Sequence, residues 1–266
     1  MIVSDDGTSE SARGLVDADH PGVIYLEGPR RGVAANRNNV VRQAQSDFVL
    51  MVDDDIALGE RFIEDIMHCL SEAEARFERS AHDIIVTGLV AEGPVVIEPH
   101  EQGFLGFQDR AYGPDDSVNT IVLGNTLFPR RLFEEIGFDE RLVAVYEEVD
   151  LATRAAARGY RIAVCKRAVN RHFPTRELTD RYGPIQDAAR LYVTFKRYAF
   201  TERRLVRAAA FAVWGPLHLF VSNAKANGLT GVRRAARALA LASRYVASYV
   251  RDSARKARRQ RGQEIR

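Results

Sequence analysis

Three consecutive aspartates, Asp53, Asp54 and Asp55, follow directly after the apolar run "DFVLMV" (47–52). Such a run is typical of a strand buried on both faces, and ligand-binding residues gather at the carboxyl ends of such strands. Adjacent carboxylates repel one another, so a cation must compensate for them. One interpretation is a Mg²⁺ or Mn²⁺ site that bridges phosphates. The other is a helix N-cap with additional acids at the positive end of the helix dipole.

A second group of acids, Glu147, Glu148 and Asp150, lies in the first turn of a helix expected over residues 147–158. A carboxylate at a helix start that faces a cleft is well placed as a general base. Acids are also common in a first turn because of the helix dipole, and Asp150 can pair with Arg154. This segment alone favours the structural interpretation.

Three further segments contain candidate ligand-binding residues. Asp5 and Asp6 follow a short apolar stub in "VSDDGTSE" (3–10), and Arg37 lies on a helix that begins near Gly32. From there Arg37 could reach a base or a diphosphate, although a single helix arginine is more often solvated. His172 follows an expected strand in a short basic loop, where a single histidine is more often structural.

The elements that would position these residues alternate along the chain. Strands are expected at 1–4, 22–28, 47–52, 83–93, 119–125 and 160–165, helices at 32–45, 59–79, 130–137 and 147–158, and a Gly/Pro-rich loop from about 93 to 118. This alternation predicts an α/β fold with helices on both faces of the sheet. After residue 183 the pattern becomes continuously helical, with expected pieces at 183–200, 202–226 and 228–257. We therefore expect domains at 1–182 and 183–266.

The net charge of +2 conceals an asymmetry between the two parts of the chain. Residues 225–266 contain 12 Lys or Arg and two acids, and residues 1–224 contain 26 basic and 34 acidic residues, so the two parts carry +10 and −8. A basic tail indicates a polyanionic surface as partner. An anionic membrane fits better than nucleic acid, because apolar residues such as Leu239, Leu241 and Tyr245 alternate with the arginines and no nucleic-acid recognition motif is present.

The longest uncharged run, residues 208–224, is interrupted by "WGP". It is shorter than the ~20 residues that a spanning helix needs, so we expect a packed or interfacial helical pair. Cys69 and Cys165 show no metal-ligand spacing and fall in apolar segments, which predicts reduced core residues of a cytosolic protein. The N-terminus shows no signal-peptide pattern. The expected location is the cytoplasm, peripherally on the inner face of the cell membrane.

Four segments in this order resemble family 2 glycosyltransferases over about residues 1–175. They are "VSDDGTSE", "GVAANRNNVVRQAQSDFVLMVDDD", "VLGNTLFPRRLFEEIGFDERL" and "YEEVDLATRAAARGYRI". The resemblance implies a GT-A fold, a nucleotide-diphosphate sugar donor and a DxD motif that uses Mn²⁺ or Mg²⁺. It also implies inverting transfer, of the hexosyl or deoxyhexosyl type, to a hydroxyl of a glycan or lipid-linked acceptor of the cell envelope.

The resemblance also implies roles for individual residues. It assigns donor-nucleotide binding to Asp5, Asp6, Arg37, Asp53 and Asp54, the sugar and acceptor side to Gly124 and Asn125, and the metal to Asp55, Asp53 and His172. Glu148 falls where the family usually has an aspartate base, so Glu147 and Asp150 stay open as alternative bases.

The chain also departs from the family pattern, because family members begin with a further strand and helix before the Asp-Asp-Gly segment. The sequence therefore predicts an N-terminally truncated domain. Two other functions stay open: a non-catalytic, degenerate glycosyltransferase-like binding protein, and a sugar-1-phosphate nucleotidyltransferase. The second would require a Gly-rich phosphate loop, and none is visible.

Overall fold

The structure is a computed structural model that describes residues 1–7, 10–113, 116–174 and 183–264. It forms two compact units, residues 1–103 with 107–179, and residues 104–106 with 180–266. The first unit contains β1 (Ile2–Asp5), α1 (Arg13–Asp19), β2 (Ile24–Glu27), α2 (Val33–Val41), β3 (Phe48–Met51), β4 (Ile56–Ala57), α3 (Phe62–Phe77), β5 (Ile84–Glu92), β6 (Val95–Ile97), β7 (His100–Gln102), β8 (Gln108–Ala111), β9 (Thr126–Pro129), α4 (Arg131–Glu135), α5 (Glu147–Ala156) and β10 (Arg161–His172). The second contains α6 (Gly183–Lys196) and α7 (Leu205–Glu264).

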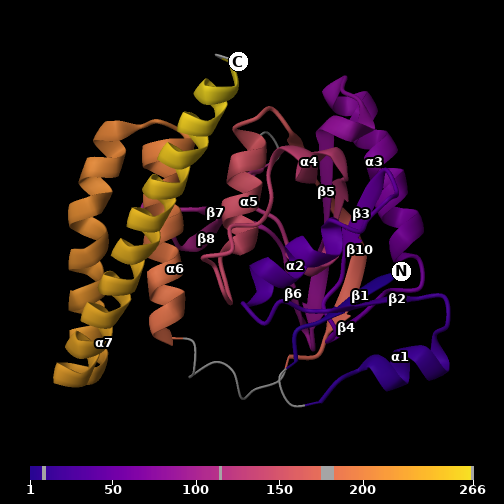
Figure 1. Ribbon diagram of the computed structural model, residues 1–266, viewed down its shortest axis with the longest axis horizontal. Helices are drawn as coiled ribbons and strands as arrows, with labels where there is room; N and C mark the ends of the chain where they lie inside the picture. Colours follow the sequence, from indigo (N-terminus) through magenta and orange to yellow (C-terminus); the bar gives the residue numbers. More distant parts are fainter. Residues whose placement is uncertain (8–9, 114–115, 175–182, 265–266) are drawn as a thin grey trace. The chain divides into compact units, whose positions relative to one another are not determined.

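The first unit is built on a mixed sheet with the strand order β3-β9-β5-β10-β4, with β6 paired to β5 (Figure 1). β10 runs parallel to β5, whereas β9 runs antiparallel to both β3 and β5. β1 and β2 form a separate parallel pair, and β7 and β8 form an antiparallel pair. The carboxyl ends of β3, β5 and β10 and the start of β9 therefore meet at one edge of the sheet.

Helices cover both faces of this sheet, as the alternation of elements predicts. Ile85 packs into a core with α2, α4 and α5, while its neighbours Ile84 and Val86 pack into a second core with α3. Successive side chains of a strand point to opposite faces, so one strand supplies both cores. This explains why the segment 83–93 is apolar without alternation.

Two expectations for residues 93–129 are wrong. The expected loop contains β6, β7 and β8, and the strand expected at 119–125 begins only at Thr126, after a 3₁₀ turn at Leu123–Asn125. The backbone of Val122 binds threonine hydroxyls instead of a neighbouring strand. Its N–H donates to Thr87 Oγ1 at 3.0 Å, and its carbonyl accepts from Thr126 Oγ1 at 2.7 Å.

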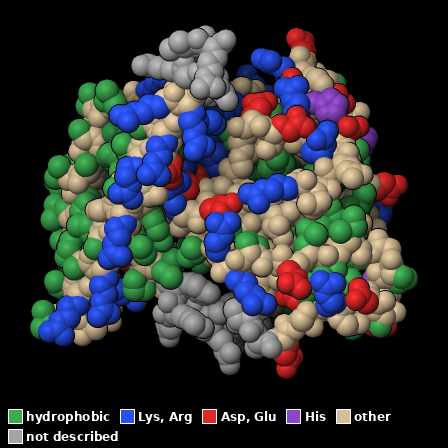
Figure 2. Space-filling view, in the orientation of Figure 1, with side chains coloured by type: hydrophobic (Ala, Val, Ile, Leu, Met, Phe, Trp, Pro, Cys, Tyr) green, Lys and Arg blue, Asp and Glu red, His purple; other side chains and the backbone are tan. Residues whose placement is uncertain are grey.

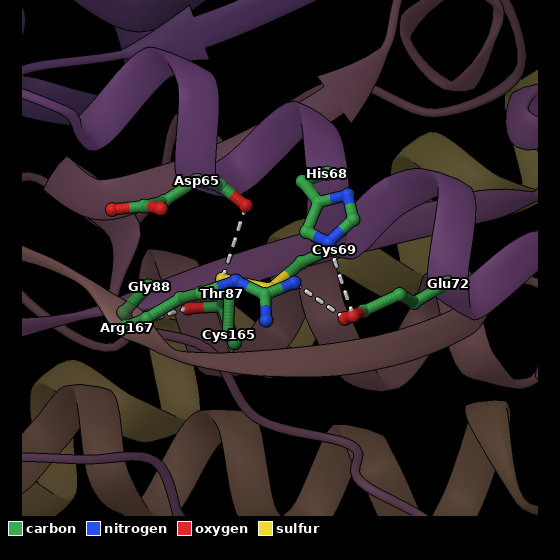
Figure 3. The surroundings of a disulfide bond; sticks show 8 residues. All are labelled: Asp65, His68, Cys69, Glu72, Thr87, Gly88, Cys165 and Arg167. Atoms are coloured by element: carbon green, nitrogen blue, oxygen red, sulfur yellow. Dashed lines mark hydrogen bonds and ion pairs between the residues drawn. A yellow bond between two sulfur atoms is a disulfide. The ribbon is translucent and has the colours of Figure 1, made fainter.

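The expectation of two reduced cysteines is also wrong, because Cys69 and Cys165 form a disulfide (Figure 3). Their separation of 96 residues hides the pairing in the sequence. α3 packs on β10 and brings the two Cα atoms to 5.8 Å, within the range that a disulfide requires. Arg167 of β10 reaches back to Glu72 of α3 at 2.5 Å beside the bridge.

The second unit is a helical assembly. Its helices lie close to the pieces expected at 183–200, 202–226 and 228–257. α6 continues into a π-helical turn at Arg197–Thr201, and α7 is broken at Asn227 and Gly228 into two arms. Alanines of the second arm, Ala235, Ala238 and Ala242, pack against Leu191 of α6 and Phe211 of the first arm. Small side chains at helical spacing allow this close packing.

The first arm continues through "WGP" with Pro216 inside the helix, consistent with the helical piece expected at 202–226. The segment Leu205–Arg259 is long and apolar enough to cross a membrane by length and composition, with a mean hydropathy of 1.4 in its most apolar window. Only 22% of that window is buried, which leaves much of its apolar surface exposed.

Candidate functional site

Several of the predicted site residues, among them Asp53, Gly124 and His172, gather at the sheet edge where β3, β5 and β10 end. Met51 pairs with Thr126, which places Asp53 beside the turn that contains Gly124. Arg171 pairs with Ala91, so His172 lies next to Glu92. β4 closes the arrangement by pairing Ile56 with His172. Residues that are far apart in the sequence therefore meet because the strands are adjacent.

Arg37 connects two of the predicted acids. Its guanidinium donates to Asp53 Oδ1 at 2.7 Å and forms a second ion pair with the Glu147 carboxylate. The Arg37 side chain is 15% exposed and that of Glu147 only 6%, whereas Asp53 is 42% exposed. The pair with Glu147 is thus buried, and Asp53 keeps one side open to a ligand.

The fold holds Arg37 at this position through its neighbours on α2. The Asn38 amide accepts from Phe138 N and donates to Phe138 O, both at 2.9 Å, which fixes the helix to the "GFDE" loop. At the helix start, Gly32 has φ of +95°, and a Cβ there would lie 2.6 Å from the Val143 carbonyl. A side chain at position 32 would therefore displace the loop that leads to α5.

The three candidate bases differ in their partners. Glu147 is paired with Arg37, and Asp150 is buried and accepts from Arg154 Nη2 at 2.6 Å. No described side chain hydrogen-bonds to the partly buried Glu148. Burial and the neighbouring charge of Glu147 raise the pKa of Glu148 to about 8. Of the three, Glu148 is therefore the carboxylate with proton affinity near neutral pH and without a cationic partner in hydrogen-bonding contact.

His172 lies between two carboxylates at the end of β10. Its Nε2 is 3.0 Å from Asp55 Oδ2 and its Nδ1 is 2.5 Å from Glu92 Oε1. Burial lowers the pKa of His172, but the hydrogen bonds to Glu92 and Asp55 outweigh burial and raise it overall. The backbone also fixes Asp55, because its carbonyl accepts from Phe173 N at 2.9 Å.

The donor set at this edge fits a hard divalent cation. Asp53 and Asp55 supply carboxylate oxygens, His172 supplies an imidazole, and Asp53 and Asp55 are each about a third or more exposed. Mn²⁺ and Mg²⁺ bind through one or two carboxylates and complete their shells with phosphate and water. Among the residues that the structure describes, no three His, Cys, Asp or Glu side chains form a ready-made metal cage. Phosphate oxygens would therefore have to complete such a site.

The predicted nucleotide side begins at the end of β1. The pKa of Asp5 is lowered, mainly by Ala12 N at 2.8 Å and also by the Tyr25 hydroxyl and Gly7 N. The Asp5 carboxylate therefore stabilises the segment that follows β1. Asp6 accepts from Arg30 N at 2.5 Å, and Asp54 is exposed. Asn36 on α2 donates to Ser4 O at 2.9 Å, which ties β1 to the helix that bears Arg37.

Gly124 and Asn125 lie in the 3₁₀ turn beside Asp53. A Cβ at Gly124 would lie 2.4 Å from Ile56 Cδ1 and 3.3 Å from Asp53 Oδ2, so a side chain there would have to displace the end of the Ile56 side chain. Asn125 is fully buried, and neither atom of its amide has a described partner. A buried polar side chain normally has a hydrogen-bond partner, so this amide is available to a ligand or to water.

Sequence reasoning missed Glu92. Glu92 is the last residue of β5, and β10 runs parallel beside it, so both strands present their carboxyl ends at the same edge. An acid at the end of a strand that is otherwise almost entirely buried and mostly apolar was the signal that could have found it.

The described fold is similar to those of solved glycosyltransferases. GalNAc-T7 in complex with UDP, GalNAc and Mn²⁺ matches with a TM-score of 0.55 at 12% identity, over 66% of this chain and 37% of that one. TarS 1–349 of S. aureus in complex with UDP-GlcNAc matches with a TM-score of 0.53 at 15% identity, over 79% and 62%. The chain thus spans less than two thirds of the length of either protein.

Sequence comparison supports the same family. No curated protein matches the chain at the level of sequence. The family model for glycosyl transferase family 2 matches residues 1–137, which is more than half of the chain and includes the segments of Asp5, Arg37, Asp53 and Asn125. The GT-A-like sheet and this match together show that the chain belongs to glycosyl transferase family 2.

Proposed function

We propose that this protein is an inverting, metal-dependent glycosyltransferase that moves a sugar from a nucleotide-diphosphate donor to a hydroxyl of a glycan or lipid-linked acceptor. The observation that carries the proposal is the ion pair of Asp53 with Arg37, which also pairs with Glu147. The Asp53 carboxylate is half exposed at the sheet edge, and Arg37 ties it to Glu147, the residue before Glu148. Donor-side acids and a candidate base are thereby held on the same side of the fold.

The proposed base is Glu148. Its pKa of about 8 gives its carboxylate enough proton affinity to take the proton of an acceptor hydroxyl. The hydroxyl oxygen then attacks the anomeric carbon from the side opposite the leaving diphosphate, the bond to that phosphate oxygen breaks, and the configuration is inverted. Arg37 and Arg154 hold Glu147 and Asp150 in ion pairs, which leaves Glu148 to do this chemistry.

Asp55, Asp53 and His172 would hold the divalent metal, Mn²⁺ or Mg²⁺, which supplies positive charge to the departing diphosphate. Asp5, Asp6, Arg37 and Asp54 would line the nucleotide side of the donor. Gly124 and the unpartnered amide of Asn125 would contact the sugar or the acceptor. These side chains fix the donor for in-line attack, which is a large part of the catalytic effect of an enzyme.

The second unit would place the enzyme peripherally at an anionic membrane surface, where lipid-linked acceptors are exposed. Ten basic residues and one acid, Asp252, lie between Lys225 and Arg259. Each basic residue near an anionic leaflet contributes about 1 kcal/mol of binding free energy. This charge supports a membrane partner.

Calorimetry with UDP and with GDP, each with and without MnCl₂, tests the donor site. We expect at least one nucleotide to bind in a Mn²⁺-dependent manner and Asp55→Ala to abolish that dependence. Asp47→Ala is the matched control, because Asp47 lies at the opposite end of the same strand and is exposed. Nucleotide binding that is equally strong in wild type, Asp55→Ala and Asp47→Ala would refute the metal assignment.

A further inference from the structure

The first arm of α7 carries an exposed apolar stripe along one side. Val206, Val213, Trp214, Leu217 and Val221 are between 44% and 87% exposed. Their successive separations of seven, one, three and four residues place them within about 100° of one face of an α-helix. The opposite face, with Phe211, Gly215 and Leu219, is buried within the second unit. The arm therefore has one face available, and that face is apolar.

No Lys, Arg, Asp or Glu interrupts this stripe between Ala208 and Ala224. Basic residues flank this uncharged run at both ends, with the exposed Arg207 before it and the exposed Lys225 after it. An uncharged helix of this length extends for roughly 25 Å at 1.5 Å per residue. An exposed apolar surface of this kind on a soluble domain indicates a partner that covers it.

The second arm of α7 carries a matching basic stripe. Arg233, Arg237, Arg244 and Arg251 are exposed and recur at intervals of four and seven residues. None of these four pairs with an acid among the described residues, in contrast to Arg37 or Arg154 in the first unit. In Figure 2 a column of hydrophobic side chains lies beside a column of basic ones over the two arms of α7.

The apolar residues that alternate with these arginines in the sequence do not share their face. Leu239, Leu241 and Tyr245 pack inside the second unit, and the Tyr245 ring lies 5.5 Å from that of Tyr192. These residues therefore use part of their apolar surface inside the second unit. The lipid-compatible apolar surface lies on the other arm.

We propose that the two arms of α7 form a monotopic membrane-binding surface, in which the first arm inserts its Trp214 stripe into an anionic leaflet and the second arm binds phosphate headgroups. This inference deepens the membrane attachment given under the proposed function and depends on it. The arm lies in the plane of the interface, because its other face is occupied by its own protein core. Amphipathic helices bind membranes in this manner by combining apolar burial with attraction of basic residues to anionic lipids.

Charge favours a lipid surface over a second copy of the chain. A symmetric dimer through the apolar stripe would bring two basic stripes near one another, and the exposed part of the second arm offers only Asp252 as a described acid. An anionic bilayer offers acyl chains to the apolar stripe and phosphate headgroups to the basic stripe. Self-association through the apolar stripe would therefore contradict the proposal.

Trp214 is the only tryptophan of the chain, so its fluorescence reports on the stripe directly. The full chain is mixed with vesicles of phosphatidylcholine alone and with vesicles of equal parts phosphatidylcholine and phosphatidylglycerol, at low and high salt. We expect binding to the anionic vesicles only, reduced by salt, with a blue shift of Trp214 emission and quenching by brominated acyl chains.

Variants separate the two stripes. Val213→Gln with Leu217→Gln should weaken binding at least roughly ten-fold, because two apolar side chains no longer enter the bilayer. Arg237→Gln and Arg244→Gln should each weaken it about five-fold and reduce its salt dependence. Ile63→Gln on α3 is the matched control, since Ile63 is 52% exposed outside the second unit, and it should bind as wild type does.

Three results would overturn the inference, and they differ in what else they affect. If the chain binds anionic vesicles but Trp214 emission and the Val213/Leu217 variant are unchanged, the assigned surface is wrong and membrane attachment stands. If the chain binds no vesicles, the assigned surface and the membrane attachment are both refuted, while the nucleotide-binding test of the transferase is unaffected. If sedimentation shows a dimer that the Val213/Leu217 variant abolishes, without vesicle binding, a second copy covers the stripe.

Discussion

Replacing Arg37 by methionine tests whether this residue holds the candidate site together. The substitution keeps most of the side-chain volume but leaves the Glu147 carboxylate, 6% exposed, without its cation. Glu147 Oε2 already has no described partner, so the local structure offers no second donor. Breaking a buried ion pair by removing one partner costs about 3–5 kcal/mol. The half-exposed pair with Asp53 adds about 0–1 kcal/mol at most.

This loss should be visible in the melting temperature of the protein. A loss of 1 kcal/mol lowers Tm by about 2–4 °C in a domain of this size, so a loss of about 3–6 kcal/mol in Arg37→Met should lower it by about 6–24 °C. Arg42→Met on the same helix is the control, because Arg42 pairs with Glu140 at 3.3 Å on the surface, with 63% of its side chain exposed. That exposed pair should change Tm by a few degrees at most.

Two further measurements identify Glu147 as the cause of the loss. Burial raises the pKa of Glu147, and removing Arg37 should raise it further. A carboxyl group with a raised pKa in the folded state stabilises the fold below its unfolded pKa and loses that contribution as pH rises through the folded value. The loss of stability in Arg37→Met should therefore be smaller at pH 5 than at pH 8. Adding Glu147→Gln to Arg37→Met should recover most of the lost stability. If Arg37→Met melts like Arg42→Met, or Glu147→Gln recovers nothing, the reasoning is refuted.

Two more predictions concern the base and the disulfide. Glu148→Gln should keep Mn²⁺-dependent nucleotide binding and lower the transfer rate by about 10²–10⁴-fold. In wild type, kcat/KM should rise with pH and level off above about 8, because only the ionised carboxylate accepts a proton. An unchanged pH profile in Glu148→Gln would instead point to Glu147 or Asp150. Reduction of the Cys69–Cys165 bridge, or Cys69→Ala with Cys165→Ala, should lower stability by about 2–4 kcal/mol, and thiol titration of the unfolded, unreduced chain should find no free thiol. Two free thiols would contradict the pairing.

Much of the fold could be predicted from the sequence because the local patterns agree with the tertiary packing. The apolar run at 84–90 is buried on both faces, and the first-turn acids of α5 mark the start of that helix. The strand at 126–129 was misplaced by several residues for a tertiary reason. In the β-branched run before it, the backbone of Val122 hydrogen-bonds to the side-chain hydroxyls of Thr87 and Thr126, and those partners become visible only when β5 and β9 pair.

The sequence indicated the members of the candidate site but not the pairings between them. The motifs indicated Arg37, Asp53 and Glu147, yet an ion pair across 110 residues cannot be read from local spacing. The surroundings of Asp5 were also not visible in the sequence, because its carboxylate accepts hydrogen bonds from the nearby Ala12, Tyr25 and Gly7. Glu92 and the disulfide were missed because both depend on which strand or helix lies beside β10.

The three aspartates raise the question of what compensates their mutual repulsion, and the structure divides the answer among them. Arg37 neutralises Asp53 from the side of α2 and α5, and His172 contacts Asp55 from the end of β10. Asp54 is exposed to water, where its charge is screened. A divalent cation at Asp53 and Asp55 would therefore replace internal cations as well as water, which weakens the binding of metal alone. Phosphate oxygens add ligands and negative charge to the same site, so the metal should bind together with the nucleotide.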